Sequence, residues 1–227
     1  MKQLKRENRE TLKRRKCLKK FLYYFKKGFA DPKYISWERG YKEQAHKQFK
    51  KELGKAAFKR SIEEGKFEEI ATAAIKIESR TNLLFSFEKM ALRDAVKTTE
   101  SAKLFSKGLY DYLYGKGNLK ERFEKYVEVI SSLPRKQTRV LTWPLVTVFG
   151  FLGNPREHIF LKPRVTKLAA ENYGYPFNYK STPNWETYKS LLDFADQIKK
   201  DTKGYDPVDY IDLQSFIWVM GSDEYPW

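Results

Sequence analysis

Apolar residues recur with the period of an α-helix along most of this chain. Steps of three and four residues place them on one helical face in five segments between residues 37 and 130. Their positions are Trp37, Tyr41, Ala45, Phe49 and Leu53; Phe67, Ile70, Ala71, Ala74 and Ile75; Leu84, Phe87, Ala91 and Ala95; Phe105, Leu109, Tyr112 and Leu113; and Phe123, Tyr126, Val127 and Ile130. Gly54 closes the first stripe, as glycine commonly does at a helix end. Each segment therefore predicts a helix with one apolar face.

A sixth segment, residues 140–152, is apolar on every side. Thr142 ahead of Trp143 and Pro144 is typical of a helix start, and Gly153 begins a Gly-Asn-Pro stop. The segment predicts a buried central helix, and its content of Val, Thr and Phe leaves a strand as the alternative. It is too short and too often interrupted to span a bilayer.

The C-terminal third adds three more predicted helices. Their boundaries are marked by Pro163 and Gly174, by Asn184, and by Asp206-Pro207 and Met220. An aromatic loop, residues 175–183, separates the first two. Because no internal repeat or low-complexity linker divides the chain, we expect an all-α fold. It would consist of one compact multi-helix domain over residues 29–227, preceded by a basic helical arm.

The arm, residues 1–28, contains twelve Lys or Arg and two Glu, so it supplies +10 of the formal net charge of +16. Leu18, Phe21, Leu22 and Phe25 would line one face of a helix there. The cations that we single out for phosphate contacts are Lys13, Arg14, Arg15, Lys16, Lys19 and Lys20. Three roles fit: binding to DNA or RNA, an interfacial helix on anionic lipid, and a solvated tail. We expect the first, because the chain stays basic through Arg60.

The composition argues against several classes of protein. Apolar residues make up 41% and aromatic residues 16% of the 227 positions, too many for a disordered polyanion-binding tail. The single cysteine, Cys17, argues against a disulfide framework and indicates an intracellular protein, cytoplasmic or nucleoid-associated. Two histidines and no HExxH, P-loop or GxGxxG motif predict no metal and no cofactor. The first residues also lack the apolar run of a cleavable signal peptide.

Basic residues cluster in the segment LPRKQTRVLTWP, just before the predicted buried helix. Arg135, Lys136 and Arg139 lie there in a Pro-flanked loop, together with Gln137 and Thr138. Cations beside hydroxyl, amide and backbone donors at a helix start suit phosphate contacts. The loop is therefore a candidate phosphate-binding element, and an ordinary solvated basic loop is the alternative.

A second cluster is HIFLKPRVTK, in which Lys162 interrupts an apolar run directly before Pro163. A lysine held against apolar walls can have its pKa lowered enough to act as an amine nucleophile or base. More ordinary roles are a side chain that extends to solvent, or a phosphate contact. Lys162 is thus a catalytic candidate, and its neighbours Arg164 and Lys167 are candidates for phosphate contacts.

Asp212 lies on the inner face of the last predicted helix, one turn after Val208 and one turn before Ser215. A buried carboxylate needs a hydrogen-bond or charge partner, since its desolvation would otherwise cost several kcal/mol. It either anchors the structure or takes part in catalysis. In the aromatic loop, Tyr175, Phe177 and Tyr179 are candidates for base stacking, and packing of the loop onto the core is the alternative.

The order of these motifs resembles the helix-hairpin-helix DNA glycosylase superfamily over residues 133–220. LPRKQTRVLTWP resembles its DNA-gripping hairpin, LVTVFGFLGNP its buried helix, HIFLKPRVTKLAAENYG the stretch that ends in a catalytic aspartate and the helix after it, and WETYKSLLDFADQI and DPVDYIDLQSFIW its closing helices. The hairpin here lacks the family's glycines and catalytic lysine, whose places fall near Trp143 and Pro144. Lys162 stands at the aspartate position. The chain is also similar to an uncharacterised prokaryotic family that shares the Trp-Pro and IDLQSFIW blocks.

The sequence therefore predicts a glycosylase-like, nucleic-acid-binding protein whose partner is DNA in particular. The aromatic loop would recognise an unusual or displaced base without catalysis. One alternative is a DNA glycosylase-type enzyme that uses Lys162 or Asp212. The other is a structural subunit whose basic arm docks on RNA or on an acidic protein.

Overall fold

The computed structural model describes the backbone of residues 2–226 and the side chains of residues 9–226. Every regular element in this range is a helix, and no strand occurs in it, so the predicted all-α class is confirmed. The elements are α1 (Lys2–Tyr24), the 3₁₀ turn η1 (Gly28–Ala30), α2 (Pro32–Tyr34), the π-helical η2 (Ile35–Arg39), α3 (Gly40–Leu53), α4 (Lys55–Glu63), α5 (Phe67–Glu78), α6 (Ser86–Ala95), α7 (Thr99–Tyr114), α8 (Leu119–Ser132), α9 (Trp143–Gly153), α10 (Pro163–Tyr173), α11 (Trp185–Asp201), the 3₁₀ turn η3 (Lys203–Tyr205) and α12 (Tyr210–Gly221).

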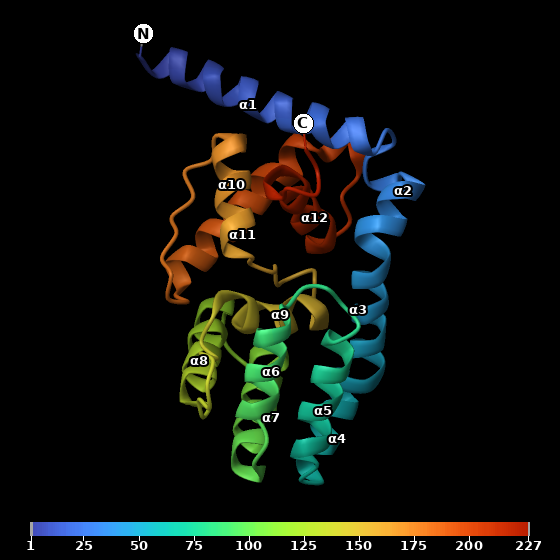
Figure 1. Cartoon of the computed structure of the whole chain (residues 1–227), viewed down its shortest axis with the longest axis vertical. Coiled ribbons are helices and arrows are strands. Elements are labelled where there is room, and N and C mark those ends of the chain that lie inside the picture. The colour runs from blue at the N-terminus through green and yellow to red at the C-terminus, as the bar shows by residue number, and fades with distance from the viewer. Residues whose placement is uncertain (1, 227) are drawn as a thin grey trace.

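Helix α9 lies near the middle of the molecule, and its residues 143–152 are all buried. This confirms the predicted central helix and excludes the strand alternative. In Figure 1, α10, α11 and α12 form a group on one side of α9, and α4 to α8 form a group on the other; α3 runs along the edge of both. None of the helices in the described range has the length and apolar content that a membrane span requires.

Helix α12 crosses α10 at very short range. A Cβ atom on Gly221 would lie 2.0 Å from the carbonyl oxygen of Val165, so only glycine permits this approach. The crossing holds the end of α12 against the start of α10, and this contact forms one wall of the cavity described below.

Helix α1 lies across one end of the molecule, over α10 and α12 (Figure 1). Phe21 and Phe25 of its predicted apolar face are fully buried, and Cys17 is 4% exposed. The Phe21 ring packs against Phe216 of α12 at 5.1 Å and against Tyr34 at 5.8 Å. The predicted amphipathic helix is therefore confirmed, and its second half belongs to the hydrophobic core.

Two inward-facing positions of the predicted stripes are in fact exposed. Trp37 is 53% exposed because the π-helical turn η2 interrupts the helical register before α3, and Lys33 Nζ covers its ring at 4.1 Å. Phe87 is 51% exposed because α6 turns Glu88 inward, where its carboxylate accepts the backbone N–H of Phe85. Hydrophobic periodicity alone does not detect a π turn, or a capping side chain that changes which face of a helix packs against the core.

One helix boundary differs from the prediction, and one helix was not predicted. Helix α12 begins at Tyr210, because the side chain of Asp209 accepts the backbone N–H of Ile211 and caps the helix. Asp206, the predicted cap, instead adopts a left-handed conformation with φ of 48°. Helix α4 was not predicted from the sequence.

A buried ionic network joins the segment after α1 to the start of α12. Asp212 is 0% exposed and accepts hydrogen bonds from Tyr34 Oη at 2.5 Å, Arg39 Nη1 at 2.7 Å and the backbone N–H of Val208 at 2.7 Å. Arg39 also donates to both carboxylate oxygens of Asp209 at 3.1 Å. These carboxylates raise the pKa of Arg39, against the effect of burial.

A second buried network lies one turn further along the same helices. Lys42 is 1% exposed and donates to Glu38 Oε2 at 3.0 Å and to Ser215 Oγ at 2.8 Å. Tyr225 Oη donates to the other oxygen of Glu38 at 2.6 Å. Burial lowers the pKa of Lys42, and Glu38 opposes that shift. The two networks together attach the first half of α12, and Tyr225 in the segment after it, to residues 34–42.

We expect Asp212→Ala to lower the free energy of unfolding by about 3–5 kcal/mol, because it leaves Tyr34 and the buried guanidinium of Arg39 without their central acceptor. Urea denaturation would measure the change. Asp193→Ala is the control, since Asp193 is half exposed and pairs only with Lys189 on the same helix; it should cost less than about 1 kcal/mol. Equal effects of the two substitutions would contradict a structural role for Asp212.

Candidate nucleic-acid interface

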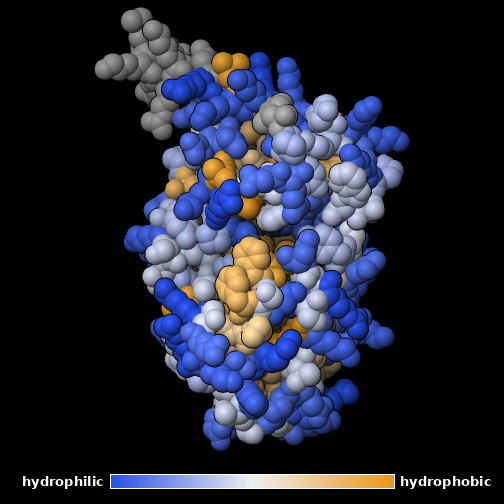
Figure 2. Space-filling model, viewed as in Figure 1, coloured by the Kyte–Doolittle hydropathy of each residue, from blue (hydrophilic) through white to orange (hydrophobic). Residues whose placement is uncertain are grey.

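A cavity of about 540 Å³ opens between the two groups of helices. Its lining residues come from five separate segments: Phe85, Phe87 and Glu88; Arg139 and Leu141 to Pro144; Lys162 to Val165; Tyr179 and Ser181; and Trp218 with Gly221 to Glu224. Figure 2 shows hydrophobic surface at the middle of this face, where the two groups meet. We refer to this feature as the central cavity.

Three helices begin at the central cavity. The starts of α6, α9 and α10 all contribute lining residues, and α9 and α10 each have a proline in the first turn. The partial positive charge of a helix N-terminus favours anionic groups. With Arg139 and Arg164 on the lining, this geometry makes parts of the wall attractive to negative charge.

Aromatic rings line much of the remaining wall. Phe85 and Phe87 stack with ring centroids 5.5 Å apart and planes at 24°, although the two side chains are 55% and 51% exposed. Tyr179 lies under Lys167 Nζ, which is 4.9 Å from the ring centroid. Trp143 is buried, and its Nε1 donates to the carbonyl of Lys180 at 2.8 Å. Exposed flat rings beside a cavity are unusual in a water-facing surface and suit stacking with a planar ligand.

Lys162, the residue that precedes α10, is only 8% exposed and lies within this wall. Its Nζ donates to the carbonyl of Leu83 at 2.8 Å, lies 3.8 Å from Glu88 Oε2 and lies 3.5 Å from the centroid of the Phe85 ring. Burial lowers its pKa, and Glu88 opposes the shift. The ammonium therefore holds the 83–85 segment and the Phe85 ring in place.

The other two cations of the cavity are more accessible. Arg164 donates to Asp223 at 2.9 Å, and both side chains are well exposed, 77% and 82%. Arg139 forms no ion pair with any described residue. A solvent-exposed pair contributes little, so a phosphate could replace Asp223 on Arg164.

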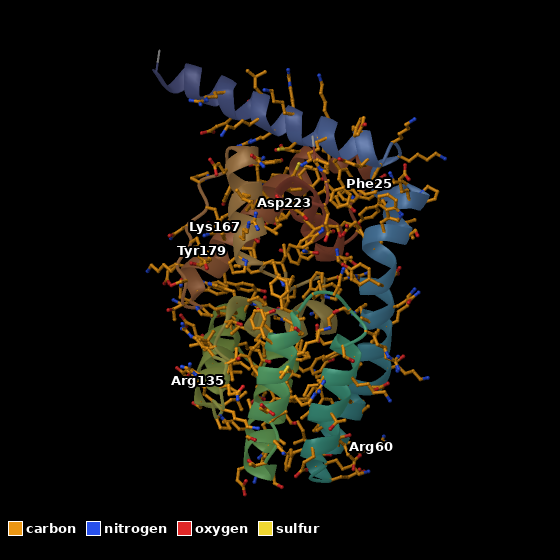
Figure 3. All side chains as sticks on the ribbon, in the orientation of Figure 1. Phe25, Arg60, Arg135, Lys167, Tyr179 and Asp223 are labelled. Carbon is orange, nitrogen blue, oxygen red and sulfur yellow. The ribbon has the colours of Figure 1, made fainter. Side chains whose placement is uncertain are left out.

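The predicted basic loop contributes only partly to the cavity. Arg139 lies on the lining. Arg135 Nε donates to the carbonyl of Gln137 at 3.2 Å, and Lys136 Nζ lies 3.9 Å from Asp94. In Figure 3, Arg135 lies well away from Lys167, Tyr179 and Asp223.

The candidate cations of the arm fall into two sets. Lys13 Nζ donates to the carbonyl of Glu171, Arg14 lies 3.9 Å from Asp201, and Lys20 is 5% exposed. These three side chains lie against other segments of the protein. Arg15, Lys16 and Lys19 are exposed. Helix α10, which carries Arg164 and Lys167, leads from the central cavity to α1 (Figures 1 and 3).

The aromatic loop reaches the cavity with one of its three candidate rings. Tyr179 is a lining residue. The Tyr175 ring stacks on Phe194 with centroids 4.7 Å apart, and the centroid of the Phe177 ring lies 6.0 Å from that of Tyr179. Neither Tyr175 nor Phe177 is a lining residue. Asp212 is not among the lining residues of this cavity, and its oxygens are occupied by the network described above.

Sequence reasoning did not identify Phe85, Phe87 or Glu88 as site residues. One signal was present: the run Leu83–Phe87 contains four large apolar residues in five positions, more than one helix face can bury. Glu88 gave no comparable signal, because glutamate at the third position of a helix is ordinary. Its place in the cavity depends on contacts between distant segments.

Searches against protein-family models, curated proteins and solved structures found no match to this chain.

We expect Asp223→Asn to raise the affinity for a short DNA duplex about two- to fivefold, because it frees Arg164 for phosphate and removes a negative charge from the cavity edge. Fluorescence anisotropy at fixed ionic strength would measure this. Asp193→Asn removes a charge from an exposed residue that does not line the cavity, and is the control. If Asp223→Asn left the affinity unchanged while a titration of the same protein showed binding, Arg164 would not contact phosphate.

Proposed function

We propose that this protein binds DNA and holds one extrahelical base in the central cavity, without catalysing a reaction on it. The observation that supports this most directly is the convergence of guanidinium groups and exposed rings on one cavity. Arg139, Arg164, Phe87 and Tyr179 come from four distant segments and all line it. Enzymes and binders that take a base out of the stack hold it between aromatic or apolar side chains.

The size and composition of the cavity fit such a ligand. About 540 Å³ lies within the range of roughly 300–1,000 Å³ that is typical of small-molecule sites. Thr142 Oγ1, on the lining, is buried with no hydrogen-bond partner among the described residues. A polar atom in this state favours a ligand that completes its hydrogen bonding.

The charge of the whole chain supports a polyanionic partner. The formal net charge is +16, and the exposed cations Arg15, Lys16 and Lys19 lie on α1. Because α10 connects α1 to the central cavity, a strand held by the α1 surface could continue past Lys167 and Arg164 to the cavity. Phosphate contacts along that path would position the nucleic acid, and the cavity would receive a base.

The resemblance to helix-hairpin-helix DNA glycosylases supports the same proposal. Lys162 stands at the position that the resemblance aligns with the catalytic aspartate, and it lies on the cavity wall. If residues 133–220 are glycosylase-like, the base-recognition pocket of that family would coincide with the central cavity. The Lys162 ammonium contacts the Leu83 carbonyl, Glu88 and the Phe85 ring, and a lysine cannot take the role of the family's catalytic carboxylate. This favours recognition of a base without its excision.

A second candidate function is covalent chemistry at Lys162. The amine lines the cavity, burial lowers its pKa, and the Glu88 carboxylate lies 3.8 Å away as a candidate proton acceptor. These are the features of an amine nucleophile. We favour binding because the Leu83 carbonyl, Glu88 and the Phe85 ring already surround Nζ.

The proposal predicts different roles for the cavity rings and the arm cations. Phe87→Ala should weaken binding to DNA with one unpaired nucleotide by about 1–3 kcal/mol and leave binding to fully paired DNA unchanged, because it removes a stacking surface for the extrahelical base. Anisotropy titrations with the two DNAs would measure both affinities. Tyr23→Ala is the matched control, since Tyr23 is 76% exposed and does not line the cavity.

The variant with Gln at Arg15, Lys16 and Lys19 completes the comparison. It should weaken binding to both DNAs to the same extent and reduce the slope of log K against log salt by about 0.9 for each phosphate that the arm no longer neutralises. If Phe87→Ala weakened binding to both DNAs equally, or to neither, the cavity would not be the site of a base.

For the second candidate, we expect no covalent product when the protein is treated with borohydride in the presence of DNA containing an abasic site. An attack of Lys162 Nζ on the open-chain aldehyde would expel water and give an imine, which borohydride reduces to a stable amine adduct. Denaturing gel electrophoresis would detect it. An adduct that disappears in Lys162→Ala, but persists in the control Lys189→Ala, would establish the covalent function instead.

A further inference from the structure

Glu88 is the most buried acidic side chain of the central cavity. It is 5% exposed, it is a lining residue, and it lies at the third position of α6. The other two lining carboxylates, Asp223 and Glu224, belong to the C-terminal segment. Asp223 is paired with Arg164, and Glu224 accepts from Trp218 Nε1 at 3.1 Å.

The two oxygens of Glu88 differ in their surroundings. Oε2 accepts the backbone N–H of Phe85 at 2.8 Å and lies 3.8 Å from Lys162 Nζ. For Oε1, no described residue provides a hydrogen bond. Oε1 is not among the buried side-chain atoms that lack a partner, so it is accessible on the lining of the cavity, where it can accept a hydrogen bond from a ligand.

The pKa of Glu88 is raised, mainly because the carboxylate is buried; the Phe85 N–H and the Lys162 ammonium oppose this shift. Oε2 thus accepts one hydrogen bond, from Phe85, and has the Lys162 ammonium 3.8 Å away. The Lys162 ammonium is itself held between the Leu83 carbonyl, Glu88 and the Phe85 ring, so it is poorly placed to donate to a ligand.

We propose that Glu88 Oε1 selects extrahelical bases that carry an exocyclic amino group, such as cytosine and adenine, over their keto counterparts. This inference rests on the proposed function and names the class of base that the same cavity accepts. An amino group donates a hydrogen bond to the carboxylate, as in the recognition of cytosine N4 by Glu or Asp. A keto oxygen in the same place would set two acceptors against each other and would give Oε1 no hydrogen bond.

The aromatic rings beside Glu88 limit the orientations that a bound base can adopt relative to Oε1. Phe85 and Phe87 form one stacked pair, and Phe85 is fixed by Lys162. Glu88 lies on the same lining as this pair, and its Oε2 accepts the Phe85 N–H, so a base stacked on the pair inside the cavity would bring one of its edges close to Glu88. The discrimination thus depends on the base edge and not on its shape, because cytosine and uracil have nearly the same outline.

The test compares DNA duplexes that are identical except for one unpaired nucleotide. The matched pairs are deoxycytidine with deoxyuridine, and deoxyadenosine with deoxyinosine. In the second member of each pair a keto oxygen replaces the amino group, and the neighbouring ring nitrogen carries a hydrogen. We expect wild-type protein to prefer the amino member of each pair about tenfold or more in anisotropy titrations. Equal affinity within both pairs, or a preference for the keto members, would overturn the inference.

Glu88→Gln tests the assignment to this residue. Glutamine can make the same capping hydrogen bond to Phe85, and its amide offers a donor as well as an acceptor, so the preference should fall below about twofold. Glu121→Gln is the matched control, because Glu121 caps the start of α8 in the same way, away from the cavity. A preference that survives in Glu88→Gln would overturn the assignment.

The outcome for the proposed function can be read separately. If none of the four unpaired nucleotides bound more tightly than fully paired DNA, the cavity would not receive a base, and the proposed function would fail together with this inference. If unpaired nucleotides bound more tightly but without regard to the amino group, only the inference about Glu88 would fail. The wild-type comparison gives this answer even if Glu88→Gln does not fold.

Discussion

The buried carboxylate of Asp212 is the interaction on which the arrangement of the two chain ends depends. It accepts from Tyr34, Arg39 and the backbone of Val208, and the parallel contact of Glu38 with Lys42 and Tyr225 repeats the connection one turn away. Removing a charged partner would leave the opposite charge less well compensated in a low-dielectric interior. The two networks therefore fix α12 against residues 34–42 and set where its C-terminal end lies.

The central cavity follows from that placement. The end of α12 crosses the start of α10 at Gly221, and the starts of α6 and α9 complete the wall from the other group of helices. Helix starts have unpaired N–H groups, and the cavity adds a buried Lys162–Glu88 pair. Such a pair is a weak source of stability. The Lys162 ammonium of this pair contacts the Phe85 ring, and Glu88 keeps one carboxylate oxygen without a partner among the described residues.

Helix α1 contributes both to the hydrophobic core and to the basic surface of the protein. Its Phe21 and Phe25 are core residues, whereas Arg15, Lys16 and Lys19 face solvent. The basic surface is thus rigidly attached to α10 and α12 and does not behave as a free tail over its second half. A rigid cationic surface loses less entropy when it binds a strand than a disordered one does. This favours a defined path from α1 along α10 to the central cavity.

The sequence by itself determined the helical class, the buried helix α9 and the amphipathic character of α1, because hydrophobic period and capping residues act over a few neighbours. It also indicated Arg139, Lys162 and Tyr179. Only the tertiary structure decided that these residues share a cavity, that Phe87 faces outward and that Glu88 keeps a free oxygen. The reason is physical: the contact that orders this wall joins Lys162 to Leu83 across 79 positions of the chain, and no local pattern encodes which distant segments meet.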